Sequence, residues 1–413
     1  MLKKYLSLLL IVALFGILAA CGNDSEKSSS SVTLDVQYYT EAISDGAIEA
    51  AKEEFSDYTL NFTEVPADDT YDVKLRTSLD SDSAPDIVTI NSNIQEFLPY
   101  ADKFVNFLDY DVESLAENYV EWKWESAKTA DKSSMIAMLI DIGPTALFYR
   151  IDLFEKAGLP TDPQEVSNTI VTSEDYMEAA KTLSEEIDKP MFLSAVALLG
   201  EEYRKLNSSM YNKEGELTLA DGKLKEIWDY TVKAVNEGYT LGTRANTIDN
   251  VVAQNKGLYG AYIGASWGVL DVKDAKETKG KWRIAKAPGG YSNQGGSYLA
   301  VLGNSDHPEE AVEVVKYLTN FDSQLANLTE NSLFPSHQEV YDTEAMVNKD
   351  EWFGGQNINE YFIEAAENIE YVYRDPRDSA AFTIFTDEIH LVESQNKDPE
   401  EAWNDAVKKA EQL

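Results

Sequence analysis

Hydrophobic and polar positions change their period several times in the N-terminal part of the chain. Alternation at 32–38, and again at 60–62, is typical of half-buried strands, and helical spacing of apolar residues in 43–55 and 71–79 predicts two helices. A short apolar run at 87–90, which follows an Ala-Pro-Asp turn, predicts a third strand. This order of strands and helices predicts a parallel sheet covered by helices.

Polar, turn-prone residues follow two of these predicted strands. In open α/β sheets ligands bind at the carboxyl ends of the strands, so these residues are candidate ligand contacts, although the same residue types also form ordinary turns. They are Tyr39, Thr40 and Glu41 after the first strand, and Asn91 and Asn93 after the third.

A Gly-Pro pair at 143–144 separates two apolar runs farther along the chain. Proline fixes its own dihedral angle and holds the preceding residue extended, so this stretch predicts a crossover between two lobes. Beyond it, the pattern predicts a short helix closed by Gly158 and a buried strand at 258–263. Two amphipathic helices follow, one with Pro308 at its first position and one capped by Asp398.

The N-terminal residues 1–20 have the pattern of a secretory signal, with two early lysines, an apolar run too short to span a membrane, and small residues at the end. The only cysteine, Cys21, directly follows Leu-Ala-Ala, which resembles the lipobox of bacterial lipoproteins. Residues 21–31 are polar and serine-rich and predict a flexible tether. We therefore expect an exported protein that is anchored to a membrane through a lipid on Cys21.

Charge and composition exclude several classes of function. The chain has 73 acidic and 35 basic side chains, a net charge of -38, and such a surface repels the nucleic-acid backbone. Three scattered histidines and one cysteine offer no zinc cluster and no disulfide framework. No glycine-rich phosphate-binding motif is present. We expect no nucleic-acid partner, no cofactor and no metal.

Three enzymatic interpretations have some support in the sequence. Residues 264–268 form a G-x-S-x-G motif around Ser266, with histidines downstream but no oxyanion segment before it. Paired carboxylates for glycoside hydrolysis cannot be singled out among so many acidic residues. Asp80, Asp82 and Asp86 lack the glycine turn and the terminal glutamate of a calcium loop. We expect a protein that is not an enzyme, and a cell-surface glycosidase or esterase remains the alternative.

Aromatic rings next to amides are the chemistry that the sequence favours for a binding site. A sugar presents one apolar ring face and a rim of hydroxyls, which aromatic platforms and planar amides can bind together. Trp267 in a glycine-flanked loop is the first candidate, and Trp352 with Gln356 in a Trp-Phe-Gly-Gly-Gln-Asn stretch is the second. The remaining tryptophans are expected in the core at Trp228, Trp282 and Trp403 and are left undecided at Trp122 and Trp124.

The order of segments resembles bacterial extracellular solute-binding proteins of the carbohydrate type, the lipoprotein receptors of ABC importers related to maltose-binding protein. The resemblance covers nearly the whole chain after the signal. The segments that carry it are the lipobox at Cys21 and residues 75–90 (LRTSLDSDSAPDIVTI), 146–159 (ALFYRIDLFEKAGL), 257–267 (GLYGAYIGASW) and 282–318, which starts WRIAKAPGGYSNQGGSY.

This resemblance implies a two-lobed type II periplasmic-binding-protein fold, in which each lobe is a mainly parallel α/β sheet flanked by helices. The implied lobes are 32–141 with 300–333, and 145–296 with 336–413. The implied hinge crossings lie near 141–145, 296–300 and 332–336. By position, the sugar-contact roles of the family fall on Tyr39, Thr40, Glu41, Asn91, Asn93, Asp141, Trp267, Gly296, Ser297 and Tyr298.

The resemblance also implies the function. We expect a monomeric, lipid-anchored receptor on the extracellular face of the bacterial membrane that captures an oligosaccharide between its lobes and delivers it to an ABC permease. A peptide or amino-acid receptor is the third class considered. It would need cationic clamps for a carboxylate, and the low arginine content near the predicted cleft argues against it.

Overall fold

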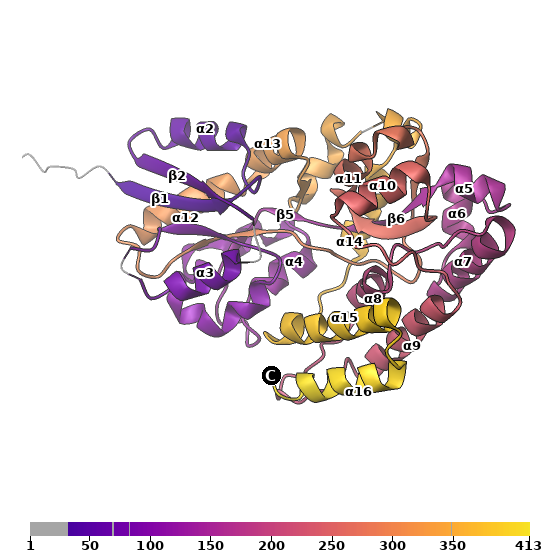
Figure 1. Ribbon diagram of the computed structural model, residues 1–413. Helices are drawn as coiled ribbons and strands as arrows, with labels where there is room; N and C mark the ends of the chain where they lie inside the picture. Colours follow the sequence, from indigo (N-terminus) through magenta and orange to yellow (C-terminus); the bar gives the residue numbers. More distant parts are fainter. Residues whose placement is uncertain (1–31, 68–69, 82, 348) are drawn as a thin grey trace, which may run out of the picture. The chain divides into compact units, whose positions relative to one another are not determined.

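The computed structural model describes residues 32–67, 70–81, 83–347 and 349–413, and Figure 1 shows their arrangement. Residues 33–413 form one compact unit. The expected signal at 1–20, the tether at 21–31 and the lipidation site Cys21 lie outside the described residues. Among the residues that are described, no helix is long and apolar enough to cross a membrane.

The first sheet contains the three strands that the N-terminal pattern predicts. β1 (Thr33–Tyr39) pairs in parallel with β2 (Thr59–Val65) on one side and with β3 (Ile87–Ile90) on the other. β9 (Tyr298–Val301) returns from the second half of the chain and pairs antiparallel with β3, and β4 (Met138–Leu139) closes the sheet. The strand order is β2-β1-β3-β9-β4.

Helices pack against this sheet and bury their apolar faces. α2 (Asp45–Glu54) starts where the Ser44 hydroxyl accepts a hydrogen bond from the backbone N–H of Ala47, 3.2 Å away. α12 (Pro308–Leu318) buries Val312, Val315 and their neighbours on one face, as its spacing predicts. α3 (Tyr71–Ser78) and α13 (Phe321–Asn331) complete the cover.

The second sheet differs from the expectation. β6 (Thr145–Arg150) is its central strand, buried at every position, and it pairs antiparallel with both β7 (Ala261–Ala265) and β8 (Trp282–Ala285). The implied mainly parallel sheet is therefore wrong for this lobe. The period of hydrophobic residues shows that a strand is buried, but it carries no information on the direction of the strand. The helices α5 to α10 also separate β6 from β7 in the sequence, so neighbouring residues do not set how the two strands pair.

A helical layer beside the second sheet holds two of the tryptophans that were expected in the core. Trp228 on α9 (Lys223–Asn236) is fully buried and its ring centroid lies 5.5 Å from that of Trp403 on α16 (Pro399–Ala410). α15 (Asp378–Gln395) packs against α16, and the two run side by side in Figure 1. The predicted cap is confirmed, because Asp398 accepts hydrogen bonds from Glu400 and Glu401.

The remaining elements connect these layers. The other helices are α4 (Glu121–Ser126), α5 (Ile151–Lys156), α6 (Pro163–Thr169), α7 (Ser173–Ile187), α8 (Ala195–Arg204), α10 (Ile248–Lys256), α11 (Gly268–Asp274) and α14 (Asn359–Asn368). The short strand pairs are β5 (Asp141–Ile142) with β10 (Phe334–Pro335), and β11 (Lys349–Asp350) with β12 (Gln356–Asn357). Short 3-10 helices occur at 94–96, 98–103, 107–110, 112–118, 276–278, 338–342, 344–346 and 351–353.

The three segments expected as hinge crossings lie close together. β5 pairs antiparallel with β10, so that Ile142 faces Phe334. The buried amide of Gln324 hydrogen-bonds the carbonyl oxygen of Leu139 at 3.0 Å and the backbone N–H of Ser336 at 2.7 Å. These contacts connect residues near 140 with residues near 335. The third segment joins them through a hydrogen bond of 3.1 Å from the backbone N–H of Ile140 to the carbonyl oxygen of Ser297. The hinge crossings and the lobe boundaries stay a prediction.

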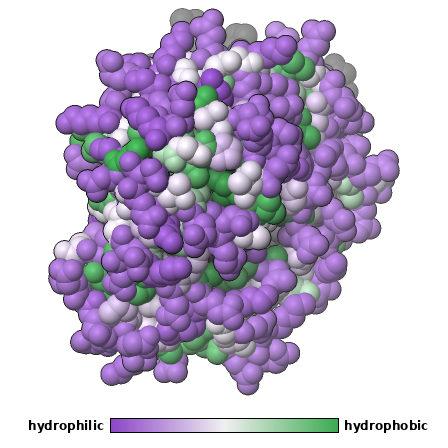
Figure 2. Space-filling view, turned by 90° about the vertical axis from the view of Figure 1, so that its right-hand side faces the viewer, coloured by the Kyte–Doolittle hydropathy of each residue, from purple (hydrophilic) through white to green (hydrophobic). Residues whose placement is uncertain are grey.

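The surface visible in Figure 2 is mostly hydrophilic. In the face shown in Figure 2, hydrophilic residues cover most of the area and apolar residues are confined to small patches between them. A high net charge of one sign favours solubility.

The core of the second sheet gives the first test. Trp282 on β8 is fully buried and its ring packs edge-on against Tyr262, with centroids 5.7 Å apart. We expect Trp282→Ala to lower the free energy of unfolding by about 3–5 kcal/mol, because it leaves a cavity in close-packed surroundings. Urea denaturation measures this change. Val171→Ala, at a position that is 54% exposed, should change it by less than about 0.5 kcal/mol, and a similar loss in both variants would contradict the assignment.

Candidate functional site

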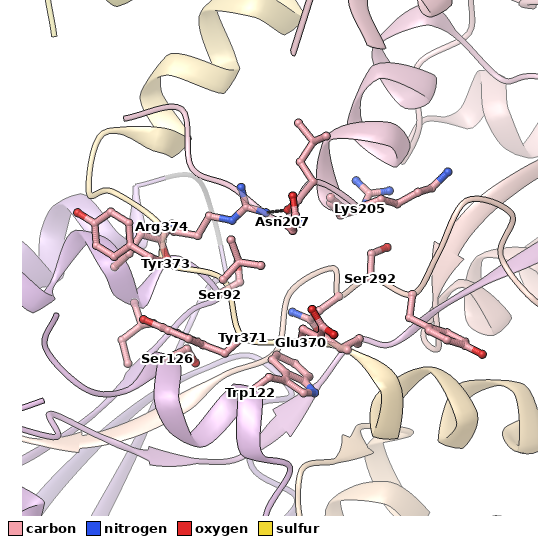
Figure 3. A pocket seen from close by; sticks show the side chains of 18 of the residues that line it. Ser92, Trp122, Ser126, Lys205, Asn207, Ser292, Glu370, Tyr371, Tyr373 and Arg374 are labelled. Carbon is pink, nitrogen blue, oxygen red and sulfur yellow. Dashed lines mark hydrogen bonds between the residues drawn. The ribbon is translucent and has the colours of Figure 1, made fainter. Parts of the chain in front are cut away.

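A cavity of about 350 Å³ is lined by residues from both halves of the chain (Figure 3). The first half contributes Ser92 after β3, and Trp122 and Ser126 of α4. The second half contributes the end of α8 with the loop that follows it, the stretch from Tyr291 to Tyr298 before and at the start of β9, and the segment 368–374 between α14 and α15. Segments that are far apart in sequence therefore form one site.

Aromatic rings make up a large part of the cavity wall. Trp122 is held by a hydrogen bond of 3.0 Å from its indole N–H to the carbonyl oxygen of Ala366, and its side chain is 9% exposed. The hydroxyls of Tyr298 and Ser126 lie 2.7 Å apart. Tyr371 is 40% exposed and, with Tyr373, belongs to the segment before α15. Fixed and accessible rings thus share one wall.

Neutral hydrogen-bonding groups and charges complete the wall. The amide-bearing residues are Gln95, Asn207, Asn293 and Asn368, and the charged ones are Lys128, Arg204, Lys205, Glu370 and Arg374. In Figure 3, Arg374, Asn207 and Lys205 lie on one side of the cavity, and Trp122, Tyr371 and Glu370 on the other. The expectation of few arginines near the cleft is wrong, because the fold brings two arginines and two lysines to this wall from separate segments.

A buried charged cluster lies next to this wall. The Asp141 carboxylate accepts hydrogen bonds from the backbone N–H of Ser297, at 2.7 Å, and from the Ser297 hydroxyl. The Tyr39 hydroxyl donates to the same Ser297 hydroxyl. The ammonium of Lys123 lies 3.6 Å from the ring centroid of Tyr298. The cluster joins the end of β1, α4, β5 and the start of β9.

Burial controls the electrostatics of this cluster. Burial lowers the pKa of Lys123 to about 7, and the nearby Asp141 opposes part of that shift. Burial likewise raises the pKa of Asp141, against the effects of Lys123 and of the Ser297 hydrogen bonds. The pKa of Tyr39 is raised well above its usual value, first by burial and then by Asp141. Burial disfavours the charged forms of Lys123, Asp141 and Tyr39, and the opposite charges and hydrogen bonds inside the cluster offset part of that effect for Lys123 and Asp141.

Gly296 is required by the same cluster. Its φ is 85°, in the left-handed region, and a Cβ at this position would lie 2.5 Å from the carbonyl oxygen of Asp141. A side chain here would push Asp141 and Ser297 apart.

The structure brings some of the predicted site residues together and not others. Asp141, Gly296, Ser297, Tyr298 and Tyr39 meet in the buried cluster, and Tyr298 also lines the cavity. The predicted turn residues after β1 and β3 line no part of the cavity. Thr40 and Glu41 are exposed, Asn91 accepts from the backbone N–H of Ser92, and the Asn93 amide donates to Glu96 at 2.9 Å.

The aromatic candidates from the sequence lie outside the cavity wall. The half-buried Trp267 ring covers Gly143 and Gly295, where an added Cβ would come within 2.2 Å and 2.7 Å of it. Gly295 itself lines the cavity, so Trp267 lies directly behind that part of the wall. Gln356 exchanges hydrogen bonds with the backbone of Ile284 on β8, and the ring of Trp352 lies under the Lys276 ammonium, 5.7 Å away.

The enzymatic alternatives gain no geometric support. The Ser266 hydroxyl has no hydrogen-bond partner within the described part of the chain. Among the same residues, no group of three or more His, Cys, Asp or Glu side chains could hold a metal ion. Of the three aspartates considered for calcium, Asp80 pairs with Lys103 and Asp86 accepts from the backbone N–H of Asp35, and Asp82 is not described.

Sequence reasoning missed residues that the structure places at or beside the cavity. Lys123 lies between two tryptophans in Trp-Lys-Trp, and Arg374 ends the run Tyr-Val-Tyr-Arg. Interleaved aromatic and basic residues are a signal of binding surfaces that a search for tryptophans alone does not use. Arg204 carries no comparable signal, because it ends an ordinary amphipathic helix.

The buried cluster gives the second test. We expect Asp141→Asn to lower the free energy of unfolding by up to about 3–5 kcal/mol, because the buried Lys123 loses its countercharge and must either stay charged without a partner or release its proton. The double variant Asp141→Asn/Lys123→Met should recover most of that loss, because no uncompensated charge remains. Urea denaturation of the two single variants and the double variant at pH 6 measures the coupling. Additive losses would show that the two side chains do not act as a pair.

A family model and a solved structure both relate the chain to extracellular solute-binding proteins. A model of the bacterial extracellular solute-binding protein family matches residues 46–353. A solved extracellular solute-binding protein of family 1 is 27% identical, with 92% of this chain and 99% of that chain covered and a TM-score of 0.88. No curated protein matches the chain in sequence.

Two sugar-bound structures share the fold. The ABC-transporter-associated binding protein of B. animalis subsp. lactis Bl-04, in complex with beta-1,6-galactobiose, is 21% identical, with a TM-score of 0.68 over 91% of this chain and 96% of that one. The galacto-N-biose/lacto-N-biose I-binding protein of Bifidobacterium longum, in complex with lacto-N-biose, is 19% identical, with a TM-score of 0.74 over 91% and 95%. The expected type II periplasmic-binding-protein fold is confirmed. The chain belongs to the bacterial extracellular solute-binding proteins.

Proposed function

We propose that the protein is the receptor of an ABC importer and that it binds an oligosaccharide in the cavity, without covalent chemistry. The observation that carries the proposal is the wall itself, which combines Trp122 and four tyrosines with amide side chains in a cavity of about 350 Å³. Ligand cavities in proteins fall mostly between about 300 and 1,000 Å³. Aromatic rings fit the apolar faces of sugar rings, and amides hydrogen-bond their hydroxyls.

The comparisons support the same class of ligand. The two structures with beta-1,6-galactobiose and lacto-N-biose share this fold along almost the whole chain. The sequence identities of these two structures are low, so the structures support only the fold. The proposal that the ligand is a sugar rests on the chemistry of the cavity wall.

Ligand capture uses the two lobes in this proposal. Closure of one lobe on the other shifts the populations of open and closed forms by the difference in ligand affinity between them. The three crossing segments near 141–145, 296–300 and 332–336 absorb the dihedral change, and the contacts of Gln324 with Leu139 and Ser336 keep them in register. Tyr39, Thr40, Glu41, Asn91, Asn93, Asp141, Trp267, Gly296, Ser297, Tyr298, Trp352 and Gln356 stay predicted contacts, to be tested in the presence of ligand.

Anchoring and delivery are further parts of the proposal. A lipid on Cys21 and the polar tether at 21–31 hold the monomeric receptor at the extracellular face of the membrane, within reach of the permease. Delivery needs only docking of the closed receptor on the permease and release of the intact sugar.

Thermal unfolding of residues 22–413 with a panel of oligosaccharides tests the function. A ligand present at 100 times its dissociation constant stabilises a protein by about 2.7 kcal/mol, which raises Tm measurably. We expect a rise in Tm with a sugar that is recovered intact after overnight incubation. Cleaved sugar would assign the protein to the hydrolases instead, and no rise with any sugar would contradict the proposed ligand class.

An exposed aromatic of the wall gives the third test. Tyr371→Ala should weaken sugar binding by about 1–3 kcal/mol and leave the unfolding free energy nearly unchanged, because the ring is 40% exposed and free to contact ligand. Tyr100→Ala is the matched control, since Tyr100 is 44% exposed and lies outside the cavity wall. Isothermal titration calorimetry with the sugar from the panel compares them. Equal affinities in the two variants would remove Tyr371 from the site.

The anchor gives the fourth test. We expect Cys21→Ala to move the protein from the detergent-rich phase to the aqueous phase in Triton X-114 partitioning, because Cys21 is the only cysteine and the only acylation site of this kind. Ser28→Ala in the tether is the control and should stay in the detergent-rich phase. A Cys21→Ala protein that partitions like the unaltered protein, after mass spectrometry has shown that residues 1–20 are removed from both, would exclude the lipid anchor.

A further inference from the structure

The cavity wall has a charge balance opposite to that of the chain. The chain carries 73 acidic and 35 basic side chains, whereas the wall has four cations, Lys128, Arg204, Lys205 and Arg374, and one carboxylate, Glu370, among the residues described. A wall that merely reflected composition would have more carboxylates than cations. The excess of positive charge therefore belongs to this site in particular.

Two of the four cations are neutralised by their own ion pairs. Lys205 Nζ lies 2.7 Å from a carboxylate oxygen of Glu202, and both side chains are 6% exposed. Lys128 Nζ lies 2.9 Å from a carboxylate oxygen of Glu125. Glu125 also pairs with Lys132, at 2.6 Å, so Lys128 shares its carboxylate with a second lysine. Both wall lysines nevertheless have a carboxylate within ion-pair distance, which distinguishes them from the two arginines.

Arg374 is held in place by neutral groups. Its two terminal nitrogens donate hydrogen bonds to the carbonyl oxygens of Ser208, at 2.9 Å, and Leu206, at 2.8 Å, the second of which is the dashed line in Figure 3. The guanidinium lies 5.1 Å from the ring centroid of Tyr203. The nearby Asp378 carboxylate is occupied by the Ser209 hydroxyl and the Met210 backbone N–H. Asp378 lies near enough for Arg374 to lower its pKa, but among the described residues no carboxylate forms an ion pair with Arg374. Peptide carbonyl oxygens and an aromatic ring therefore hold the guanidinium, which has five N–H donors in all.

Arg204 also lacks a paired carboxylate. Its Nε has no hydrogen-bond partner in the described part of the chain. The carboxylates near it are Glu202, which pairs with Lys205, and Glu201, which accepts from the backbone N–H of Ile263 at 3.0 Å. Burial raises the pKa of Glu201 to about 7, so this side chain is only partly charged near neutral pH. Both carboxylates act on the charge of Arg204, but within the described part of the chain neither forms an ion pair with it.

We propose that the cavity selects an oligosaccharide that carries a carboxylate, as a uronic acid unit does, and that Arg374 and Arg204 determine this specificity. The inference rests on the proposed sugar-binding function and names its ligand class. A planar guanidinium binds a carboxylate through two parallel hydrogen bonds, with a geometry that neutral sugars cannot use. The aromatic residues of the wall bind the remaining sugar units of the oligosaccharide, in the same way for acidic and neutral sugars.

Calorimetric titration of matched sugars tests the proposal. The pairs are xylotriose against xylobiose that carries glucuronic acid, and α-1,4-galactobiose against α-1,4-digalacturonate. We expect the acidic member of at least one pair to bind tenfold or more tightly than its neutral partner, with an affinity that falls as NaCl increases. A sulfated galactobiose separates carboxylate recognition from a general preference for anions.

Variants assign the specificity to the arginine. Arg374→Gln should weaken binding of the acidic sugar at least tenfold more than binding of its neutral partner. Arg244→Gln is the matched control, because Arg244 is exposed and lies outside the wall. Circular dichroism confirms that both variants fold with the same Tm.

Each result separates this inference from the proposed function. Neutral sugars that bind as tightly as their acidic partners would overturn the carboxylate specificity and leave the sugar receptor standing. Tighter binding of the sulfated sugar than of the uronates would overturn the assignment to a carboxylate. Equal weakening of both members of a pair by Arg374→Gln would give Arg374 a general role instead. Failure of every sugar to bind would overturn both proposals.

Discussion

The contact between Asp141 and Ser297 is the constraint on which the rest of the site depends. One buried carboxylate accepts the backbone N–H and the hydroxyl of Ser297 and faces the buried ammonium of Lys123. Asp141 belongs to β5, Ser297 directly precedes β9 and Lys123 belongs to α4, so the contact fixes the place where the first sheet meets the segments that lead to the second. Trp122 and Tyr298, which line the cavity, are the chain neighbours of Lys123 and Ser297. A buried pair of this kind costs stability when one partner is lost, which makes the arrangement specific.

The chain as a whole is acidic, whereas the cavity wall has more basic than acidic side chains. The acidic surface keeps a protein of net charge -38 soluble, while the cavity wall carries two arginines without paired carboxylates. Fixing Arg374 with peptide carbonyls and an aromatic ring keeps its charge available, because those partners hold the side chain without neutralising it. Dissolved salt screens the exposed surface charges beyond about 10 Å at 0.1 M ionic strength, whereas charges in a partly buried wall are screened less.

The sequence predicts local elements well and the site only in part. Period-two alternation at 32–38 and the cap at Asp398 depend on neighbouring residues, and the structure confirms both β1 and α16. The direction of β7 relative to β6 and the convergence of Trp122 with Tyr371 depend on contacts across more than a hundred residues, which periodicity does not contain. Trp267 was selected for its glycine-rich loop. That loop places its ring over Gly143 and Gly295, behind the cavity wall.

The central claim is that the ligand occupies the cavity beside Trp122. The indole N–H signals of the seven tryptophans in a ¹⁵N-labelled sample report on it directly, with each signal assigned by a Trp→Phe variant. At saturation with the oligosaccharide, the signal of Trp122 should shift most, and those of Trp228 and Trp403, which are buried in the helical layer, should stay in place. An unchanged Trp122 signal in a sample that binds the sugar would contradict the account.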